Sequence, residues 1–368
     1  MVIIRVVCLD LGSFTDYSIQ LANELSKTET VKLMLPKHSI KEHINHVDKK
    51  VFLTLFKLPH RLYQWSNVFM LFKIIINVNN FKPDVIHLQG GYLQSCFALP
   101  FLKKYPLITT FHDPKPHLGE ESLLLGFTQW WTRKFSNQII VHGEKLKEQM
   151  VKEYNIPSEK VHAIPIGEHE VAPFKKYERK DLKEDKNLIL FFGRIWEYKG
   201  LEYLIKAEPM ITKEVPDAKI IIAGTGEDFK KYEEMMANRD NFIVYNYRIP
   251  YKEGAELFQR CSVVALPYID ASQSGVIPTA YGFKKPVVVT DVGSIPEIVD
   301  DGVTGFIVPP KNPEALADAI VKLLKDTKLR KQMGENAYKK LKNDMSWDKI
   351  AEKTIEIYKK AIRDKTCN

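Results

Sequence analysis

Residues 187–207, NLILFFGRIWEYKGLEYLIKA, run from an apolar strand through a polar loop into a helix. An unbroken apolar run such as LILFF is typical of a strand that is buried on both faces. After Gly200, apolar residues recur at helical spacing. A buried strand followed by an amphipathic helix is the repeating unit of a parallel sheet. The stretch therefore predicts an α/β fold for its part of the chain.

The same alternation continues along the whole chain. Short β-branched and apolar runs predict strands at 2–9, 31–35, 84–88, 106–111, 137–142, 160–166, 187–193, 218–224, 241–246, 262–267, 286–291 and 305–310. Helical periodicity appears at 16–25, 199–211, 230–239, 253–261, 313–326 and 346–366. Together these patterns predict parallel sheets with helices on both faces.

The length of 368 residues favours two domains of ordinary size. The alternation pauses at residues 167–187, which are polar, highly charged and poor in periodicity. We therefore expect an N-terminal domain at 1–170, a linker at 171–186, a C-terminal domain at 187–345 and a final helix at 346–368. Ligands of open parallel sheets bind at the carboxyl ends of the strands, so we expect the chemistry in a cleft between the domains.

Composition indicates an ordinary globular protein, with 45% hydrophobic and 27% charged residues. The four cysteines, at positions 8, 96, 261 and 367, have neither disulfide nor metal-ligand spacing, which suits a reducing, cytoplasmic compartment. The N-terminus lacks the apolar core and cleavage site of a signal peptide. The longest charge-free run, 85–102, is interrupted by polar residues, so we expect no spanning helix.

The net charge of +8 is concentrated at residues 51–115, where seven Lys or Arg face two Asp. A basic region suits nucleic acid, an anionic membrane or an anionic substrate, and no nucleic-acid-binding motif accompanies it. The stretches 55–76 and 122–135 mix aromatic, aliphatic and basic residues. They predict either a peripheral surface for anionic lipid or core-facing helices whose Lys and Arg reach outward.

Two cations follow the strand that opens the second domain. Arg194 comes directly after Gly193, and Lys199 precedes Gly200 at the expected helix start. Arginine can donate to two phosphate oxygens at once, and lysine adds a mobile charge. The pair predicts an anion site, although surface ion pairing is an equal alternative.

The loop 271–276, ASQSGV, supplies the second candidate anion site. Pro278 is natural only in the first turn of a helix, so the helix should begin near Val276 and expose the amides of residues 274–277. With Gly275 there, a phosphate can reach these amides and the positive helix end. The alternative is ordinary capping by Ser272 or Ser274.

Other strand ends give weaker signals. Gly224 and Gly226 could let backbone approach a ligand or form a tight turn. His112 and Asp113 follow the strand at 106–111, where a histidine can contact substrate or simply be a satisfied polar residue. Dinucleotide-binding, Walker and nucleophile-elbow motifs are absent, and so is the Asp-x-Asp pair of many metal–diphosphate sites. We expect no metal and no other cofactor.

With these motifs in hand, the chain resembles the GT-B glycosyltransferases of family 4, which are retaining and use nucleotide sugars. The most specific parts are FFGRIWEYKGLEYLIKA, IIIAGTGED, VALPY and AYGFKKPVVVTDVGSIPEIVDDGVTGFIVPP; PDVIHLQGG, TTFHD and VHAIPIG match more loosely. The resemblance implies two Rossmann-like domains across a cleft, with the final helix returning to the first domain.

The resemblance also implies roles for single residues. As catalytic residues it implies His112, beside the donor sugar, and Arg194 and Lys199, which hold the diphosphate. It implies donor contacts for Gly12, Gly193, Gly224, Gly226, Asp270, Ser274, Gly275, Val276 and Thr279. On the acceptor side it implies Gly90, Gly91 and Asp113.

The sequence departs from the family where two glutamates usually stand with seven residues between them. Ala271 and Thr279 occupy those positions. The first glutamate normally holds hydroxyls of the donor sugar and the second holds the ribose. Asp270 could replace the first, and Thr279 offers the ribose one hydroxyl. A lost charge-assisted hydrogen bond costs about 1.5–3 kcal/mol, so donor binding could be weaker.

The resemblance therefore predicts retaining transfer from a nucleoside-diphosphate sugar to a hydroxyl of a glycan or lipid-linked acceptor, in cell-surface polysaccharide or glycolipid synthesis. We expect a cytoplasmic protein, with peripheral contact at the inner membrane face and no nucleic-acid partner. The missing glutamates leave two alternatives: a catalytically weak nucleotide-sugar-binding partner subunit, or another GT-B enzyme such as a sugar-nucleotide epimerase or a phosphorylase.

Overall fold

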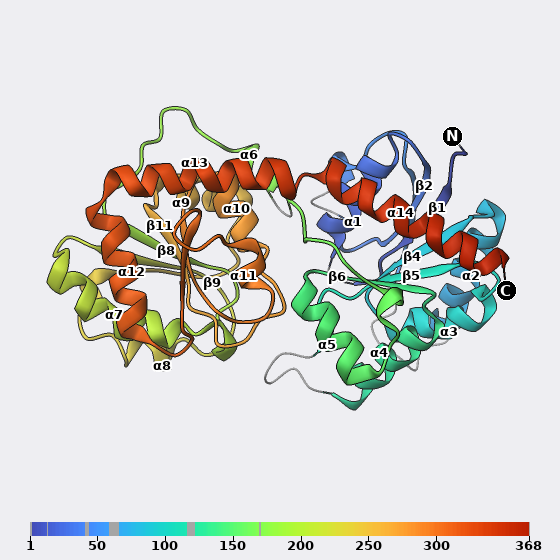
Figure 1. Cartoon of the computed structure of the whole chain (residues 1–368), viewed down its shortest axis with the longest axis horizontal. Coiled ribbons are helices and arrows are strands. Elements are labelled where there is room, and N and C mark those ends of the chain that lie inside the picture. Colours follow the sequence, from blue (N-terminus) through green and yellow to red (C-terminus); the bar gives the residue numbers. More distant parts are fainter. Residues whose placement is uncertain are drawn as a thin grey trace. The chain divides into compact units, whose positions relative to one another are not determined.

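The computed structural model describes residues 2–12, 14–40, 44–58, 66–115, 122–168 and 171–367. The chain forms two compact units, one of residues 1–165 and 347–368 and one of residues 166–346. Each unit is an α/β body built on its own sheet of parallel strands (Figure 1). The two sheets share the strand order of a Rossmann-like fold. In this order successive strands are added first on one side of the first strand and then on its other side.

The first unit contains a seven-stranded sheet in the order β3-β2-β1-β4-β5-β6-β7. Its strands are β1 (Arg5–Leu9), β2 (Thr30–Pro36), β3 (Phe52–Phe56), β4 (Val85–Gln89), β5 (Leu107–Thr110), β6 (Gln138–Val141) and β7 (Val161–Ala163). Its helices are α1 (Thr15–Leu25), α2 (Ser66–Phe81), α3 (Leu93–Leu102), α4 (Leu123–Phe135), α5 (Glu144–Tyr154) and α14 (Trp347–Thr366). The sequence patterns missed β3, an edge strand whose burial does not alternate clearly.

The second unit contains a six-stranded sheet in the order β10-β9-β8-β11-β12-β13. Its strands are β8 (Leu188–Phe192), β9 (Lys219–Gly224), β10 (Phe242–Asn246), β11 (Val263–Leu266), β12 (Val287–Thr290) and β13 (Gly305–Val308). Its helices are α6 (Val171–Lys175), α7 (Leu201–Glu214), α8 (Lys230–Glu233), α9 (Tyr251–Arg260), α10 (Val276–Gly282), α11 (Ile295–Ile298), α12 (Pro313–Lys325) and α13 (Thr327–Asp344). The helix expected at 230–239 is only the single turn of α8.

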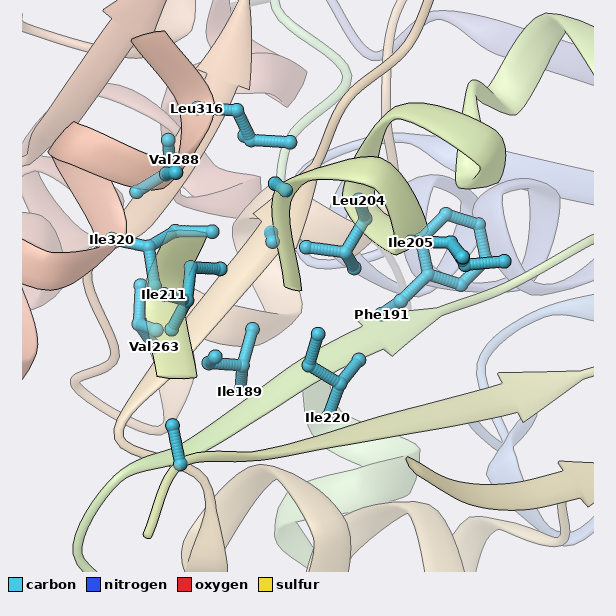
Figure 2. Packing of buried hydrophobic residues seen from close by; sticks show 14 of the residues in the cluster. Ile189, Phe191, Leu204, Ile205, Ile211, Ile220, Val263, Val288, Leu316 and Ile320 are labelled. Atoms are coloured by element: carbon cyan, nitrogen blue, oxygen red, sulfur yellow. The ribbon is translucent and has the colours of Figure 1, made fainter. Parts of the chain in front are cut away.

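The core of the second unit lies between the sheet and the pair α7 and α12. Ile189 and Ile220 project from β8 and β9 toward Leu204 and Ile211 of α7, with Ile320 of α12 beside them (Figure 2). All five side chains are almost fully buried. Burying a large aliphatic side chain contributes about 1.5–3 kcal/mol, so this cluster holds β8 and the start of α7 in place.

The final helix, α14, belongs to the first unit and packs against α1, β4 and β5. Tyr358 is fully buried there, and its hydroxyl lies 2.7 Å from Nδ1 of His87 on β4. Near the end of the helix, Nε2 of Gln138 donates to Asp364 at 2.9 Å. The last residues of the chain therefore complete the core of the unit that its first residues begin.

The expected linker at 171–186 is wrong: this stretch belongs to the second unit. Phe174 of α6 is buried, although two lysines follow it directly in the sequence. Oxygens of Glu184 lie 2.8 Å from Nζ of Lys285 and 2.9 Å from Nη2 of Arg330. Both cations are buried, so their ion pairs hold Glu184 against the body of the second unit. The sequence pattern misled because ion pairs with distant residues leave no local periodicity.

No helix in the described part of the chain is long and apolar enough to cross a membrane.

Candidate functional site

Glycines bring the ends of β8 and β9 into direct contact. A Cβ on Gly224 would lie 1.7 Å from the carbonyl oxygen of Gly193, and one on Gly226 would lie 1.9 Å from that of Ile195. Gly193 itself has φ +120°, and its N–H donates to Ala223 at 3.0 Å. The sequence suggested that these glycines leave room for a ligand. The structure shows that Gly224 and Gly226 first leave room for the neighbouring loop.

Arg194 and Lys199 gather around two tyrosine rings at the same edge of the sheet. The guanidinium carbon of Arg194 lies 5.8 Å from the centre of the Tyr198 ring, and Nζ of Lys199 lies 4.9 Å from it. Nζ of Lys199 is also 3.7 Å from the centre of the Tyr268 ring. A cation over an aromatic face is attracted by the negative potential of the ring. The two cations predicted from the sequence therefore do lie together.

Tyr268 links these cations to the loop before α10. Its ring is buried, which raises the pKa of the phenol well above its usual value. Its hydroxyl lies 3.3 Å from Oγ of Ser274, while its ring faces Lys199. Tyr268 is the last residue of the motif VALPY, but the sequence patterns predicted no role for it. The available signal was an aromatic residue two positions after a buried strand.

Helix α10 begins at Val276, as its proline predicted. The N-cap residue is Gly275, and no side chain caps the first turn. Ser272 and Ser274 are therefore not caps: the Ser272 carbonyl accepts from Ser294 N–H at 3.1 Å, and the Ser274 hydroxyl faces Tyr268. A helix start of this kind leaves backbone N–H groups for a ligand.

The start of α10 lies beside the end of β8. A Cβ on Gly193 would be 3.8 Å from Cγ2 of Val276. Among the described residues, the buried Oε1 of Gln273 has no hydrogen-bond partner. The two cations and the uncapped helix start therefore lie at one edge of the second unit.

The positions of the absent glutamates are buried. Ala271 is 4% exposed and Thr279 is 1% exposed. The Thr279 hydroxyl donates to the Gly275 carbonyl at 3.1 Å, so its proton is used inside the helix. The N–H of Asp270 donates to the Tyr198 carbonyl at 3.3 Å, and its side chain is partly exposed beside the Lys199 loop.

In the first unit, His112 lies in a buried row of hydrogen bonds at the carboxyl ends of β4, β5 and β6. Its Nε2 lies 2.9 Å from Oε1 of Gln89, and its Nδ1 lies 2.9 Å from Nε2 of His142. Nδ1 of His142 faces the Ile164 carbonyl at 3.0 Å. The Phe14 ring stacks on His112 with 3.6 Å between centroids. These contacts fix the orientation of the imidazole.

His87 continues the same polar row toward α14. Nε2 lies 2.7 Å from Oγ1 of Thr110, and burial lowers the pKa of His87 to about 3. This imidazole is therefore neutral at physiological pH. Sequence reasoning missed Gln89, His87 and His142. The signal was present, because each is a polar residue in an otherwise apolar strand or at its end.

The remaining residues expected in the first unit make close contacts within that unit. A Cβ on Gly12 would lie 1.9 Å from the Tyr92 ring, which also lies 3.4 Å from the corresponding position on Gly90. A Cβ on Gly91 would lie 2.7 Å from Oγ1 of Thr132 on α4. The Asp113 carbonyl accepts from Gln129 of α4 at 3.2 Å.

Asp10 is a further buried group beside Gly12. Its carboxylate accepts from Gly12 N–H at 2.8 Å and from the Ser18 hydroxyl at 2.9 Å. Burial raises its pKa to about 6, and these two hydrogen bonds oppose the shift. Asp10 thus ties the loop after β1 to α1. No group of three or more His, Cys, Asp or Glu side chains in the described residues could hold a metal ion.

Comparison with known proteins gives the family. The model for glycosyl transferases group 1 matches residues 174–340, and the model for Glycosyltransferase Family 4 matches residues 16–167. An uncharacterized glycosyltransferase of Methanocaldococcus jannaschii is 32% identical over 302 residues, which cover 76% of each chain. The D-inositol 3-phosphate glycosyltransferase of Corynebacterium diphtheriae is 27% identical over 308 residues, covering 76% of this chain and 71% of its own.

Solved structures agree on the fold. The crystal structure of Anabaena HepE in complex with UDP-glucose has a TM-score of 0.73 at 16% identity, covering 97% of this chain and 100% of that one. Both family models, the relative at 32% identity and the two Rossmann-like sheets lead to the same assignment. The chain belongs to the GT-B glycosyltransferases of family 4.

Proposed function

We propose that the protein transfers a sugar from a nucleoside-diphosphate sugar to a hydroxyl of a glycan or lipid-linked acceptor, with retention at the anomeric carbon. The observation that carries the proposal is the cluster of Arg194, Lys199 and the uncapped start of α10 at one sheet edge. A diphosphate is the group that this combination of two cations and free N–H donors suits. The related HepE was crystallised with UDP-glucose, which supports the donor class.

The reaction places negative charge where the cations lie. The bond between the anomeric carbon and the diphosphate oxygen breaks, and the acceptor oxygen bonds to that carbon. The acceptor proton passes to the departing diphosphate. Arg194, Lys199 and the α10 amides stabilise this leaving group, and preorganised donors of this kind contribute several kcal/mol in other enzymes. We propose that these groups, rather than a metal ion, carry the diphosphate charge.

The first unit supplies an oriented imidazole. His112 is held by Gln89, His142 and the Phe14 ring, so its position is set before any ligand binds. We propose that it contacts the donor sugar beside the anomeric centre. Such a preorganised contact favours the transition state, because the imidazole does not have to be ordered when the sugar binds.

Substitution of the two cations tests the donor site. We expect Arg194→Ala and Lys199→Ala each to lower turnover at least about tenfold, because each loses charge stabilisation of the leaving group. Turnover is measured as release of the nucleoside diphosphate from a panel of nucleoside-diphosphate sugars. Circular dichroism checks that each variant is folded. Lys213→Ala, an exposed lysine on α7 of the same unit, is the matched control. Near-normal turnover in both site variants would refute the assignment.

Two further measurements test the mechanism. We expect turnover to persist in excess EDTA, because Arg194 and Lys199 already neutralise the diphosphate. Loss of activity in EDTA, restored by Mg²⁺, would show that a metal is needed. The anomeric configuration of the product by NMR should match that of the donor; inversion would overturn the retaining assignment.

The buried Thr279 supports a second candidate. Since its hydroxyl proton is already used by Gly275, this position offers little to a ribose, and Ala271 offers no side-chain donor or acceptor. A catalytically weak nucleotide-sugar-binding subunit would shift its melting temperature with donor yet release no diphosphate with any acceptor. An epimerase would change the sugar, and a phosphorylase would require phosphate, so the same assay separates these outcomes.

The proposal includes a location. We propose that the protein works in the cytoplasm at the inner face of the cell membrane and meets its acceptor, in cell-surface polysaccharide or glycolipid synthesis, at an anionic lipid surface. The support is an exposed apolar and basic face on the first unit. The first unit contains most of the exposed large hydrophobic residues in the described part of the chain.

A further inference from the structure

Three helices lie next to one another on one face of the first sheet. Helix α2 packs beside α3, and α3 packs beside α4 (Figure 1). Their inner sides are buried in the core: Met70, Ile74 and Val78 of α2, and Leu99 and Leu102 of α3. The helices therefore fold against the sheet as ordinary core helices, and their apolar residues exceed what that packing needs.

Each helix carries a second apolar stripe that faces outward. On α2, Phe69, Phe72 and Ile76 are 69%, 57% and 54% exposed, spaced three and four residues apart on the side opposite the core. One side of the helix thus faces the core, as one of the two interpretations predicted, and the other side leaves large apolar side chains exposed. The part of the stretch at 59–65 lies outside the described residues.

Helices α3 and α4 repeat this arrangement. Phe97 and Phe101 of α3 are 58% and 63% exposed, one helical turn apart. On α4, Leu123, Phe127 and Trp130 are exposed with the same helical spacing. We call these eight outward residues the α2–α4 face: Phe69, Phe72, Ile76, Phe97, Phe101, Leu123, Phe127 and Trp130. Large exposed apolar side chains gathered on three neighbouring helices are typical of an interaction surface.

The charges on this face are all positive. Helices α2, α3 and α4 contain no Asp or Glu. Lys73, Lys104 and Lys134 continue the three apolar stripes and are exposed. In the described residues, none of these lysines has an ion-pair partner. The nearest acids in sequence before α4, at 120 and 121, lie outside the described residues.

A cavity opens beside this face, where α3 and α4 end. It has a volume of about 230 Å³, and Leu99, Leu102 and Phe135 are among its lining residues. Lys103, Lys134 and Lys365 also line it, and all three are exposed. The accessible lining of this cavity is mostly polar, and its three lysines suit the phosphate of an anionic lipid.

We propose that the α2–α4 face docks the protein on a bilayer containing anionic phospholipid, and that the lysines of the cavity beside it bind the phosphate of one such lipid. Aromatic side chains enter the interface and lysines meet the phosphates. The all-positive charge favours lipid over a second copy of this chain, because a self-complementary contact would bring like charges together. This inference rests on the proposed function only in placing the acceptor at the membrane.

Vesicle flotation tests the docking surface directly. The 368-residue protein should float with phosphatidylcholine vesicles that contain phosphatidylglycerol, and not with phosphatidylcholine alone. Phe69→Ser/Phe101→Ser/Trp130→Ser should lower the bound fraction at least about tenfold, because three exposed anchors are lost. Val303→Ser, an exposed apolar residue of the second unit, is the matched control.

A charge reversal tests the electrostatic part. Lys104→Glu/Lys134→Glu should abolish the preference for anionic vesicles, and raised salt should weaken wild-type binding. Lys328→Glu, exposed on α13, should leave binding unchanged. Lys103→Glu alone, which alters the cavity, should weaken binding to anionic vesicles without affecting the melting temperature.

Three results would overturn the inference: unchanged flotation of the triple serine variant, equal binding to neutral vesicles, or a wild-type dimer that the serine variant converts to monomer without any vesicle binding. Diphosphate release with a water-soluble acceptor separates this inference from the proposed function. The triple serine variant should keep that activity, whereas Arg194→Ala should lose it and still float.

Discussion

At the scale of single residues, glycine and tyrosine positions determine the geometry of the donor site. Gly224 and Gly226 let two strand-end loops approach each other, and Gly200, with φ +64°, approaches the Pro267 carbonyl so closely that a Cβ would lie 1.9 Å away. Tyr268 then connects Lys199 to the loop of Ser274. The two cations were predictable from sequence spacing. The position of Tyr268, the ring that Lys199 contacts, depends on contacts between two loops and was not.

Asp10 gives a prediction at this scale. Its folded-state pKa of about 6 lies above the ordinary 3.8, because burial disfavours the carboxylate. The folded state therefore holds the proton more tightly than the unfolded state. The stability that this proton provides is complete below about pH 4 and is lost as pH rises through about 6.

The variant Asp10→Asn removes this pH dependence. Wild type should lose about 3 kcal/mol in the free energy of unfolding, relative to Asp10→Asn, between about pH 4 and pH 8. Urea denaturation at both pH values measures the difference. A constant difference between the two proteins would show that the carboxyl is not buried as described.

At the scale of elements, the carboxyl ends of β4, β5 and β6 carry one row of polar side chains. The row runs from His142 through His112 and Gln89 to His87, and ends at Tyr358 of α14. The sequence pattern located every one of these strands. It could not show that a helix more than two hundred residues later completes the row.

Tyr358→Phe tests the contribution of α14. The ring is kept, but His87 loses a buried hydrogen-bond partner, which should lower the free energy of unfolding by about 1–3 kcal/mol. Thermal and urea denaturation measure the change. Tyr338→Phe, on α13 of the second unit, removes a partly exposed hydroxyl and should have almost no effect. Equal effects of the two substitutions would contradict the role of Tyr358.

At the scale of the whole molecule, the chain leaves its first unit after residue 165 and returns at 347. The second unit is therefore a continuous segment, and its hydrophobic cluster contains no residue from the first. Arg194, Lys199 and the α10 start also belong to it. The proposed diphosphate site thus needs no residue of the other unit for its own structure.

A fragment of residues 166–346 should therefore fold alone and bind a nucleoside diphosphate. Circular dichroism tests folding, and isothermal titration with UDP, GDP and ADP tests binding. Arg194→Ala in the same fragment is the control for the site. An unfolded fragment, or a folded fragment that binds none of the three nucleotides, would contradict this prediction.

The sequence by itself determined the α/β class, twelve of the strands, the helix start at Val276 and the two cations after β8, because these depend on local periodicity and on residue types at strand ends. Family membership followed from the same motifs. Only the tertiary structure decided that Thr279 is turned inward, that residues 171–186 pack into the second unit, and that His112 is held by Gln89 and His142. Each of these depends on contacts between residues far apart in the chain or on the direction of a side chain, and neither leaves a local pattern.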